Sequence, residues 1–220
     1  MAGGNANSEP AARLGLMLNQ PEDATTLYVL AHGAGADMRH HFMEDVSRHL
    51  AEQRVATLRY NFPYMAAGGK RPDPPAVLES AVRKAIQEGY EAADGRTLIA
   101  GGKSMGGRMT SQALAKKPDP RVKGIAFLGF PLHQPGKPST ERAVHLAQVQ
   151  VPMLFIQGTR DNLANLDMMQ EVAASLGSLA TLHIIDTADH SFAVLKRANK
   201  TKEDVYREIA TTVSAWASSL

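Results

Sequence analysis

The segment Gly102-Lys103-Ser104-Met105-Gly106 has the strongest potential for chemistry in this chain. It fits the pattern Gly-x-Ser-x-Gly, in which a serine on a sharp strand-to-helix turn becomes an exposed nucleophile. Glycines two residues on either side suit such a strained turn, because a Cβ at either position would crowd it. The N-terminus of a following helix would also favour negative charge developing at Ser104. The pattern alone is weak evidence, so its weight depends on partner residues elsewhere.

The same segment invites a second interpretation, because Gly102-Lys103-Ser104 contains the Gly-Lys-Ser of a phosphate-binding loop. That loop needs another glycine five residues before Gly102, and position 97 is Thr. The phosphate cradle would therefore lack its first glycine, and this interpretation is rejected.

A glycine-rich segment, His32-Gly33-Ala34-Gly35-Ala36-Asp37, follows an apolar run much earlier in the chain. Acyl transfer requires two backbone N–H groups aimed at the oxyanion of the tetrahedral intermediate. The residue after the nucleophile, Met105, would supply one, and Ala34 is expected to supply the other. The alternative is an ordinary glycine-rich turn before a helix. Beside the serine segment, the oxyanion hole is favoured.

Two further segments offer an acid and a base. Asp161 ends Gly158-Thr159-Arg160-Asp161, and His190 lies in the loop 186–192. An aspartate can orient a histidine that takes the proton of a serine. Asp161 could instead cap a helix that begins near residue 163. His183 is a poorer base because it lies inside a predicted strand, and Asp186 and Asp189 are weaker acid candidates because they are close to His190 in sequence.

The elements that must position these residues alternate between short apolar strands and amphipathic helices. Strands are predicted at residues 13–18, 26–31, 54–60, 97–100, 122–130, 151–157 and 181–185. Helices are predicted at residues 37–52, 76–89, 105–116, 140–146, 163–176 and 202–217, the last with a capping box at Thr201 and Asp204.

This alternation predicts an α/β fold, a three-layer αβα sandwich around a mostly parallel sheet of about seven strands. Functional sites in such folds lie beyond the carboxyl ends of the strands. Ser104, Asp161 and His190 each follow a separate strand, and their order along the chain is that of α/β-hydrolases.

Composition limits the classes of function. The 220 residues are 44% hydrophobic with a net charge of +2 and no basic cluster, so no nucleic-acid partner is expected. The chain has no Cys, no secretory signal and no apolar run near the roughly 20 residues that span a bilayer. We expect no membrane partner and a cytoplasmic protein, with a flexible tail at residues 1–10 and one domain at residues 11–220. It is expected to be a monomer or homodimer.

A metal site is not expected, although His32, His40 and His41 lie close together in sequence. No carboxylate stands at ligand spacing with them. The predicted chemistry needs neither a metal nor an organic cofactor.

Several strings carry a resemblance to a known family. They are AHGAGADM (residues 31–38), RYNFPYM (59–65), RPDP (71–74), GGKSMGGRM (101–109), GFPLHQPGKP (129–138), IQGTRD (156–161) and DHSF (189–192). Over residues 11–220 the chain resembles the α/β-hydrolase superfamily. Within it, the strings resemble a subgroup named for a testis-expressed protein and for a subunit of the non-specific-lethal histone acetyltransferase complex. That subgroup includes bacterial hydrolases often compared with dienelactone hydrolases. The resemblance implies a catalytic triad of Ser104, Asp161 and His190.

The function expected from these residues is that of a serine hydrolase of the carboxylesterase type, acting on a small-molecule ester. The segment between residues 130 and 151 is too short for a separate lid domain, so an open cleft and a small or water-soluble substrate are expected. Lys103 and Arg108 could attract an anionic group or be solvated or paired. The residues predicted to bind substrate are His32, Gly33, Asn61, Phe62, Tyr64, Pro131 and Leu132.

Three alternatives remain open: a thioesterase, a small peptidase on the same three residues, or a protein-interaction module that keeps the fold without catalysis.

Overall fold

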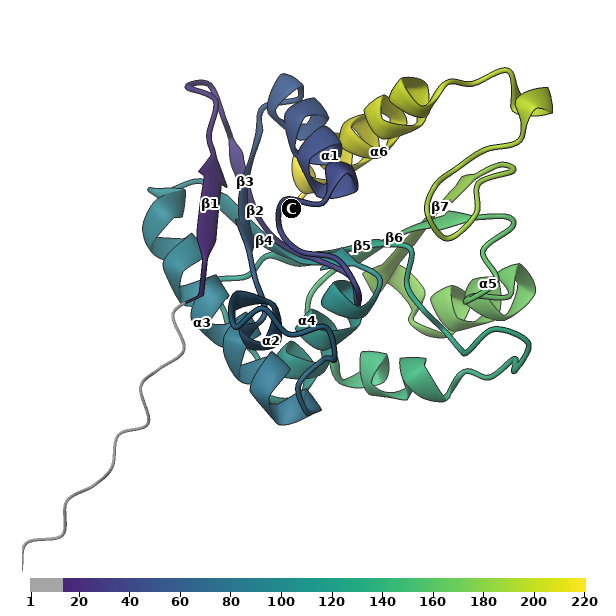
Figure 1. Cartoon of the computed structure of the whole chain (residues 1–220), viewed down its shortest axis with the longest axis horizontal. Helices are drawn as coiled ribbons and strands as arrows, with labels where there is room; N and C mark the ends of the chain where they lie inside the picture. Colours follow the sequence, from purple (N-terminus) through teal and green to yellow (C-terminus); the bar gives the residue numbers. More distant parts are fainter. Residues whose placement is uncertain (1–13) are drawn as a thin grey trace, which may run out of the picture.

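The computed structural model describes residues 14–220, so the expected tail at residues 1–10 lies outside the described part. A seven-stranded sheet runs through these residues in the order β1-β3-β2-β4-β5-β6-β7 (Figure 1). The strands are β1 (Leu16–Asn19), β2 (Thr26–Ala31), β3 (Val55–Tyr60), β4 (Thr97–Lys103), β5 (Gly124–Leu128), β6 (Met153–Gly158) and β7 (Ala180–Ile185). Strand β1 pairs antiparallel with β3, and the other pairings are parallel. The predicted sandwich with a mostly parallel sheet is confirmed.

Helices cover both faces of the sheet. The α-helices are α1 (His41–Glu52), α2 (Pro63–Ala66), α3 (Pro75–Ala93), α4 (Met105–Lys116), α5 (Leu166–Ser175) and α6 (Lys202–Ala217). Three short 3₁₀ segments are η1 (Glu141–Gln148), η2 (Gly177–Leu179) and η3 (Lys196–Ala198). Helices α1 and α6 lie side by side on one face, whereas α3, α4 and α5 cover the other (Figure 1).

The alternation of side chains along each strand divides the core into two apolar layers. In β2, Leu27 and Val29 pack with the layer under α3 and α4, while Tyr28 and Leu30 pack with the layer under α1 and α6. All six residues of β2 are buried, as the continuous apolar run predicts for a strand covered on both faces.

Local capping explains where the helices begin. His40, not Asp37, caps α1, because its Nδ1 accepts the Phe42 N–H at 3.3 Å. Asp37 instead accepts the Arg39 N–H at 2.8 Å in the preceding turn, so the prediction of a helix starting at residue 37 is wrong. The capping box of Thr201 and Asp204 at α6 is confirmed.

Other boundaries differ in the same way. The helix predicted from residue 163 begins at Leu166, where Asn165 accepts the Met168 N–H. The segment predicted as a helix at 140–146 is the 3₁₀ segment η1, and the chain between the predicted strand 54–60 and the predicted helix 76–89 contains the short helix α2. Side-chain caps and prolines, which compete locally with helix propensity, set these limits.

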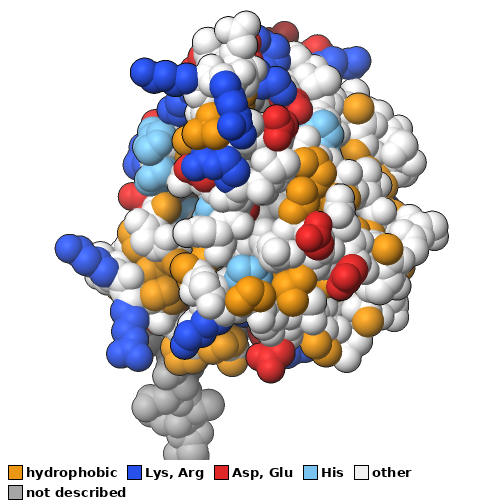
Figure 2. Space-filling model, turned by 90° about the vertical axis from the view of Figure 1, so that its right-hand side faces the viewer, with side chains coloured by type: hydrophobic (Ala, Val, Ile, Leu, Met, Phe, Trp, Pro, Cys, Tyr) orange, Lys and Arg blue, Asp and Glu red, His pale blue; other side chains and the backbone are white. Residues whose placement is uncertain are grey.

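The connection between β5 and β6 consists of a loop and η1, so the fold has no lid domain there, as predicted. In residues 14–220, none of the helices has the length and apolar character needed to cross a bilayer. The face that carries β7 and α5 shows Lys and Arg side chains gathered near its top (Figure 2). Lys196, Arg197 and Lys200, in the connection to α6, are exposed.

Candidate active site

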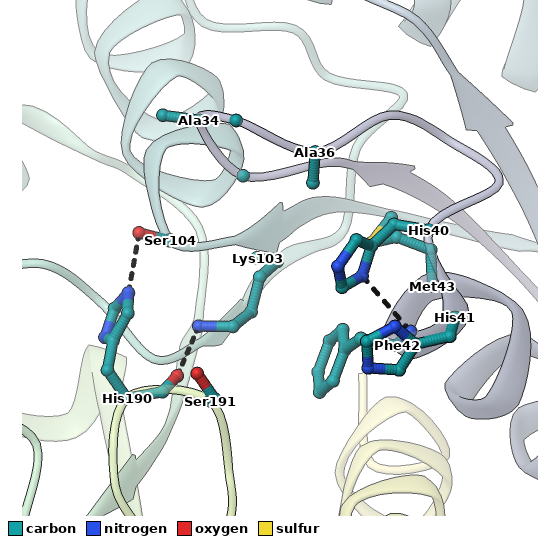
Figure 3. Close-up of a pocket in the computed structure, with 12 residues that line it drawn as sticks. Ala34, Ala36, His40, His41, Phe42, Met43, Lys103, Ser104, His190 and Ser191 are labelled. Atoms are coloured by element: carbon teal, nitrogen blue, oxygen red, sulfur yellow. Dashed lines mark hydrogen bonds between the residues drawn. The ribbon is translucent and has the colours of Figure 1, made fainter.

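Three side chains from separate strand ends form a hydrogen-bonded chain. Ser104 Oγ lies 2.9 Å from His190 Nε2, and His190 Nδ1 lies 2.7 Å from Asp161 Oδ2 (Figure 3 shows the first contact). A carboxylate accepts only, so Nδ1 carries the ring proton and Nε2 accepts the Ser104 O–H. Because β4, β6 and β7 are parallel and close in the sheet, residues 104, 161 and 190 meet at one edge.

The turn that presents Ser104 is strained. Its φ of 50° and ψ of −118° lie in a region that side-chain-bearing residues rarely adopt. A Cβ at Gly102 would lie 2.2 Å from the Ala31 carbonyl oxygen, and one at Gly106 would lie 2.5 Å from the His32 carbonyl oxygen. Glycine is therefore required on both sides, for the steric reason that the sequence pattern suggested.

Asp161 is held by more than His190. Its side chain is 1% exposed, and its Oδ2 also accepts the Gln157 amide N–H at 2.6 Å. Its Oδ1 accepts the Leu163 N–H at 2.8 Å, which orients the carboxylate without capping α5. The Gln157 amide oxygen in turn accepts the Phe130 N–H at 3.0 Å. Sequence reasoning missed Gln157, although a lone amide at the end of an apolar strand was the available signal.

The loop that carries His190 is ordered by a different carboxylate. Asp189 Oδ1 accepts the N–H groups of Ser191 at 2.8 Å and of Ala193 at 3.0 Å. Asp186 accepts the Thr159 hydroxyl, and His183 pairs with Glu208 on α6. The alternative acids and the alternative base therefore have other partners.

The glycine-rich segment lies directly against the nucleophile. A Cβ at Gly33 would lie 3.5 Å from Ser104 Cβ, and Ala34 lines the same cavity as Ser104. Met105 is the first residue of α4, so its N–H has no acceptor within the helix. The two amides predicted to bind an oxyanion, those of Ala34 and Met105, thus flank Ser104.

His32 fixes this segment to the chain after β3. The ring is fully buried; its Nε2 accepts the Phe62 N–H at 3.1 Å, and its Nδ1–H donates to the Gly33 carbonyl at 2.8 Å. Burial lowers the pKa of His32, which keeps the ring neutral, as the accepting Nε2 requires. His32 therefore supports the loop from beneath, whereas the sequence suggested substrate contact.

A cavity of about 370 Å³ opens beside Ser104 (Figure 3). Its walls come from the glycine-rich segment, the start of α1, the nucleophile turn and the histidine loop. The lining residues are Gly33, Ala34, Gly35, Ala36, His40, His41, Phe42, Met43, Lys103, Ser104, His190 and Ser191. Gly33 is the one residue of the predicted substrate-binding set among them.

The other residues predicted to bind substrate are placed elsewhere. Phe62 and Leu132 are fully buried in the core, with Tyr64 5% exposed and Pro131 also buried. Asn61 accepts the Met38 N–H at 2.9 Å and so braces the chain before α1. None of these side chains is among those that line the cavity beside Ser104.

The two basic residues near the nucleophile have different surroundings. Lys103 donates to the carbonyl of His190 at 2.6 Å. Arg108 lies on α4, and its Nε is buried without a hydrogen-bond partner in residues 14–220. Burial, and the nearby Arg142, lower the pKa of Arg108. No cluster of three or more metal-ligating side chains exists in the described part of the chain.

Comparison with known families identifies the type of domain. The profile of a family described as an alpha/beta hydrolase domain matches residues 24–218. That span contains Ser104, Asp161 and His190 together with six of the seven strands.

Similar solved structures agree on the fold. An alpha-beta serine hydrolase homologue from Coxiella burnetii is 16% identical with a TM-score of 0.74, covering 93% of this chain and 93% of that one. Dienelactone hydrolase from Anabaena variabilis is 22% identical with a TM-score of 0.71, covering 92% and 90%. A Xanthomonas campestris protein described as an α/β serine hydrolase without a lid is 20% identical with a TM-score of 0.70, covering 92% and 89%.

Proposed function

Because this chain belongs to the α/β-hydrolase family, we propose that it is a serine hydrolase that cleaves a small or water-soluble ester through an acyl-enzyme on Ser104. The observation that carries the proposal is the hydrogen-bonded chain from Ser104 through His190 to Asp161. A serine whose proton can pass to an oriented, neutral imidazole is an activated nucleophile.

Acylation begins when Ser104 Oγ attacks the ester carbonyl carbon and His190 Nε2 takes the hydroxyl proton. The carbonyl π electrons move to the oxygen, and the N–H groups of Ala34 and Met105 stabilise that oxyanion. Asp161 stabilises the imidazolium. The tetrahedral intermediate then collapses, the C–O bond to the alcohol breaks, and His190 gives its proton to the leaving alkoxide.

Deacylation repeats these steps with water. His190 takes a proton from a water molecule as its oxygen attacks the acyl carbon, and the second tetrahedral intermediate expels Ser104 Oγ. The proton returns from His190 to Ser104, and the carboxylic acid leaves. No metal or organic cofactor takes part in this sequence.

The cavity supports a small substrate. Its volume of about 370 Å³ is at the lower end for small-molecule sites, and no lid domain encloses a long acyl chain. A carboxylesterase-type activity on short or compact esters fits these dimensions. The similarity to a dienelactone hydrolase and the sequence strings quoted above support the subgroup that includes dienelactone-hydrolase-like bacterial enzymes.

Labelling with a fluorophosphonate probe tests the proposal directly. The wild-type protein should be labelled at Ser104, Ser104→Ala should not be labelled, and the matched control Ser111→Ala should be labelled like wild type. Failure of the wild type to react, or labelling of Ser104→Ala, would overturn the assignment. A panel of p-nitrophenyl esters, acyl-CoA thioesters and aminoacyl amides should then show the highest kcat/KM for a short ester.

A further inference from the structure

A lysine beside the nucleophile holds the main chain of the proposed base. Lys103, the last residue of β4, donates from Nζ to the His190 carbonyl oxygen at 2.6 Å (Figure 3). In the close-up, the Lys103 side chain extends from the nucleophile turn to the histidine loop. This hydrogen bond joins two segments that are 87 residues apart in sequence. Lys103 directly precedes Ser104, and the acceptor belongs to His190 itself.

The surroundings of the ammonium are mostly aromatic. Nζ lies 5.8 Å from the ring centre of Phe42 and 5.3 Å from that of Phe192, and these rings stack at 5.7 Å. Both distances are within the range of cation–π attraction. Gly129 leaves room for the arrangement: with φ of +72°, its added Cβ would lie 3.1 Å from Lys103 Nζ and 3.6 Å from His190 Nδ1.

The ammonium of Lys103 lacks a carboxylate partner in the described part of the chain. No ion pair of Lys103 is formed within residues 14–220, and the acceptor of its hydrogen bond is the neutral carbonyl of His190. Burial lowers the pKa of Lys103 to about 8, although the carboxylates of Asp161 and Asp189 act in the opposite direction. The Lys103 side chain is half-buried and lines the cavity, so its charge is incompletely hydrated and has no carboxylate partner to offset that cost within residues 14–220. Such a local inconsistency at a candidate active site points to a functional role.

We propose that Lys103 is a positioning residue that holds the histidine loop in register with Ser104, so that His190 Nε2 meets the serine hydroxyl. This inference rests on the proposed function, because it assigns a role within the same site. Lys103 itself does not touch the reacting atoms in this role. It fixes the backbone from which His190 projects.

The hydrogen bond from Lys103 to the His190 carbonyl matters because the other anchors of the histidine loop hold the residues after His190. Asp189 ties the backbone of residues 191 and 193 to itself, and Phe192 inserts into the apolar layer under α1 and α6. In residues 14–220, Lys103 is the side chain that bonds to the main chain of His190. Small displacements of a catalytic group, on the order of 1 Å, cost about 10²-fold in rate.

The test uses Lys103→Met, which keeps an unbranched apolar stem between the two rings but removes the ammonium. Its matched control is Lys196→Met, an exposed lysine on η3. Both variants and wild type are assayed on a neutral short ester and on an ester of the same size that carries a carboxylate. We expect kcat of Lys103→Met to fall about 10²-fold on both esters, with KM within about twofold, while the control matches wild type.

Two readouts separate this role from a general loss of structure. At pH 7 the melting temperature of Lys103→Met should stay close to that of wild type, because the half-buried ammonium that is removed has no carboxylate partner within residues 14–220. Hydrogen exchange of the amides in residues 190–193 should be faster in Lys103→Met than in wild type and in Lys196→Met, because the loop opens more often.

The outcomes are distinct. An unchanged kcat with unchanged exchange overturns the inference. A rise in KM confined to the carboxylate ester also overturns it, since Lys103 would then bind an anionic substrate group instead. If the wild-type protein is neither labelled nor active, the proposed function fails, and the exchange comparison still decides whether Lys103 holds the loop.

Discussion

Helix α4 carries two serine–histidine pairs. Ser104 Oγ, at its start, lies 2.9 Å from His190 Nε2, and Ser111 Oγ, two turns along, lies 2.8 Å from His145 Nε2. The two hydrogen bonds are almost equal in length. Their surroundings differ in every other respect that matters for chemistry, so the pair shows what a nucleophile needs beyond a nearby base.

The first difference is the group that hydrogen-bonds to each imidazole on the side away from its serine. His190 has the buried carboxylate of Asp161 at its Nδ1, whereas His145 has a backbone carbonyl, that of Arg142. A carboxylate stabilises the imidazolium that forms when serine loses its proton, and a neutral carbonyl does so far less. Burial and the nearby Arg108 lower the pKa of His145 to about 4, so this ring resists protonation.

The difference continues in the backbone and in access. Ser104 has a strained φ of 50° and lines a cavity, whereas Ser111 lies inside α4 and is fully buried. The Ser111 hydroxyl also donates to the Arg108 carbonyl oxygen at 3.0 Å, so its proton is engaged by the backbone of its own helix. We interpret the second pair as a structural clasp between α4 and η1.

The largest expected effect comes from removing each serine in turn. Ser104→Ala should lower kcat roughly 10⁶-fold, the loss typical of a missing serine nucleophile, whereas Ser111→Ala should stay within about twofold of wild type. Ester hydrolysis with active-site titration measures both. Equal losses of kcat in the two variants would contradict the proposal that the Ser104 pair, and not the Ser111 pair, is catalytic.

A smaller effect should follow from neutralising the carboxylate behind His190. Asp161→Asn should lower kcat about 10⁴-fold, because an amide favours the wrong tautomer of the imidazole. Asp189→Asn is the matched control, and it should cost less because Asp189 contacts the loop backbone. If kcat of Asp161→Asn stays within tenfold of wild type while that of Asp189→Asn collapses, the acid has been misassigned.

The second pair should affect stability alone. His145→Leu removes the hydrogen bond between the ring and the Ser111 hydroxyl and should lower the free energy of unfolding by about 1 kcal/mol, with kcat unchanged. Urea denaturation measures the stability, and hydrolysis of the same ester measures kcat. A loss of activity greater than the loss of folded protein would contradict a purely structural role.

A further effect is the pH dependence of that stability. The pKa of His145 is lowered from 6.5 to about 4, so the unfolded chain binds more protons between these values. Its contribution to stability is therefore present above pH 6.5 and falls as the pH drops toward 4. Arg108 and Lys116 oppose protonation of the ring, while Glu79 favours it. The difference in unfolding free energy between wild type and His145→Leu should shrink on acidification, and a constant difference from pH 7 to 4 would contradict this.

Much of the proposed site could be predicted because its residues follow strands that are readable in the sequence. Apolar runs located β2, β4, β6 and β7, and the parallel topology then brought residues 104, 161 and 190 to one edge. The capping box at Thr201 was equally readable, because its partners are three residues apart. Short-range patterns and sheet geometry together were sufficient for these features.

The cavity wall was not predictable in the same way. Which side chains face Ser104 depends on how the start of α1, with Phe42 and Met43, packs across the sheet. Gly129 acts through Lys103 and His190, which are distant in sequence. Gln157 stood out only as a lone amide in an apolar strand, and its contact with Phe130, 27 residues earlier, could not be read from that position. Contacts of this kind depend on the assembled tertiary structure.

The separation of 86 positions between Ser104 and His190 along the chain has a consequence during biosynthesis. Domains fold from the N-terminus as they are synthesised, at roughly 5–20 residues per second. The strained serine turn can form when β2, β4 and α4 have emerged, whereas the base arrives with the loop after β7, and α6 then covers that face. Under the proposed mechanism, a growing chain on the ribosome therefore carries an inert serine until its final quarter is made, and hydrolytic activity would begin only when the fold closes.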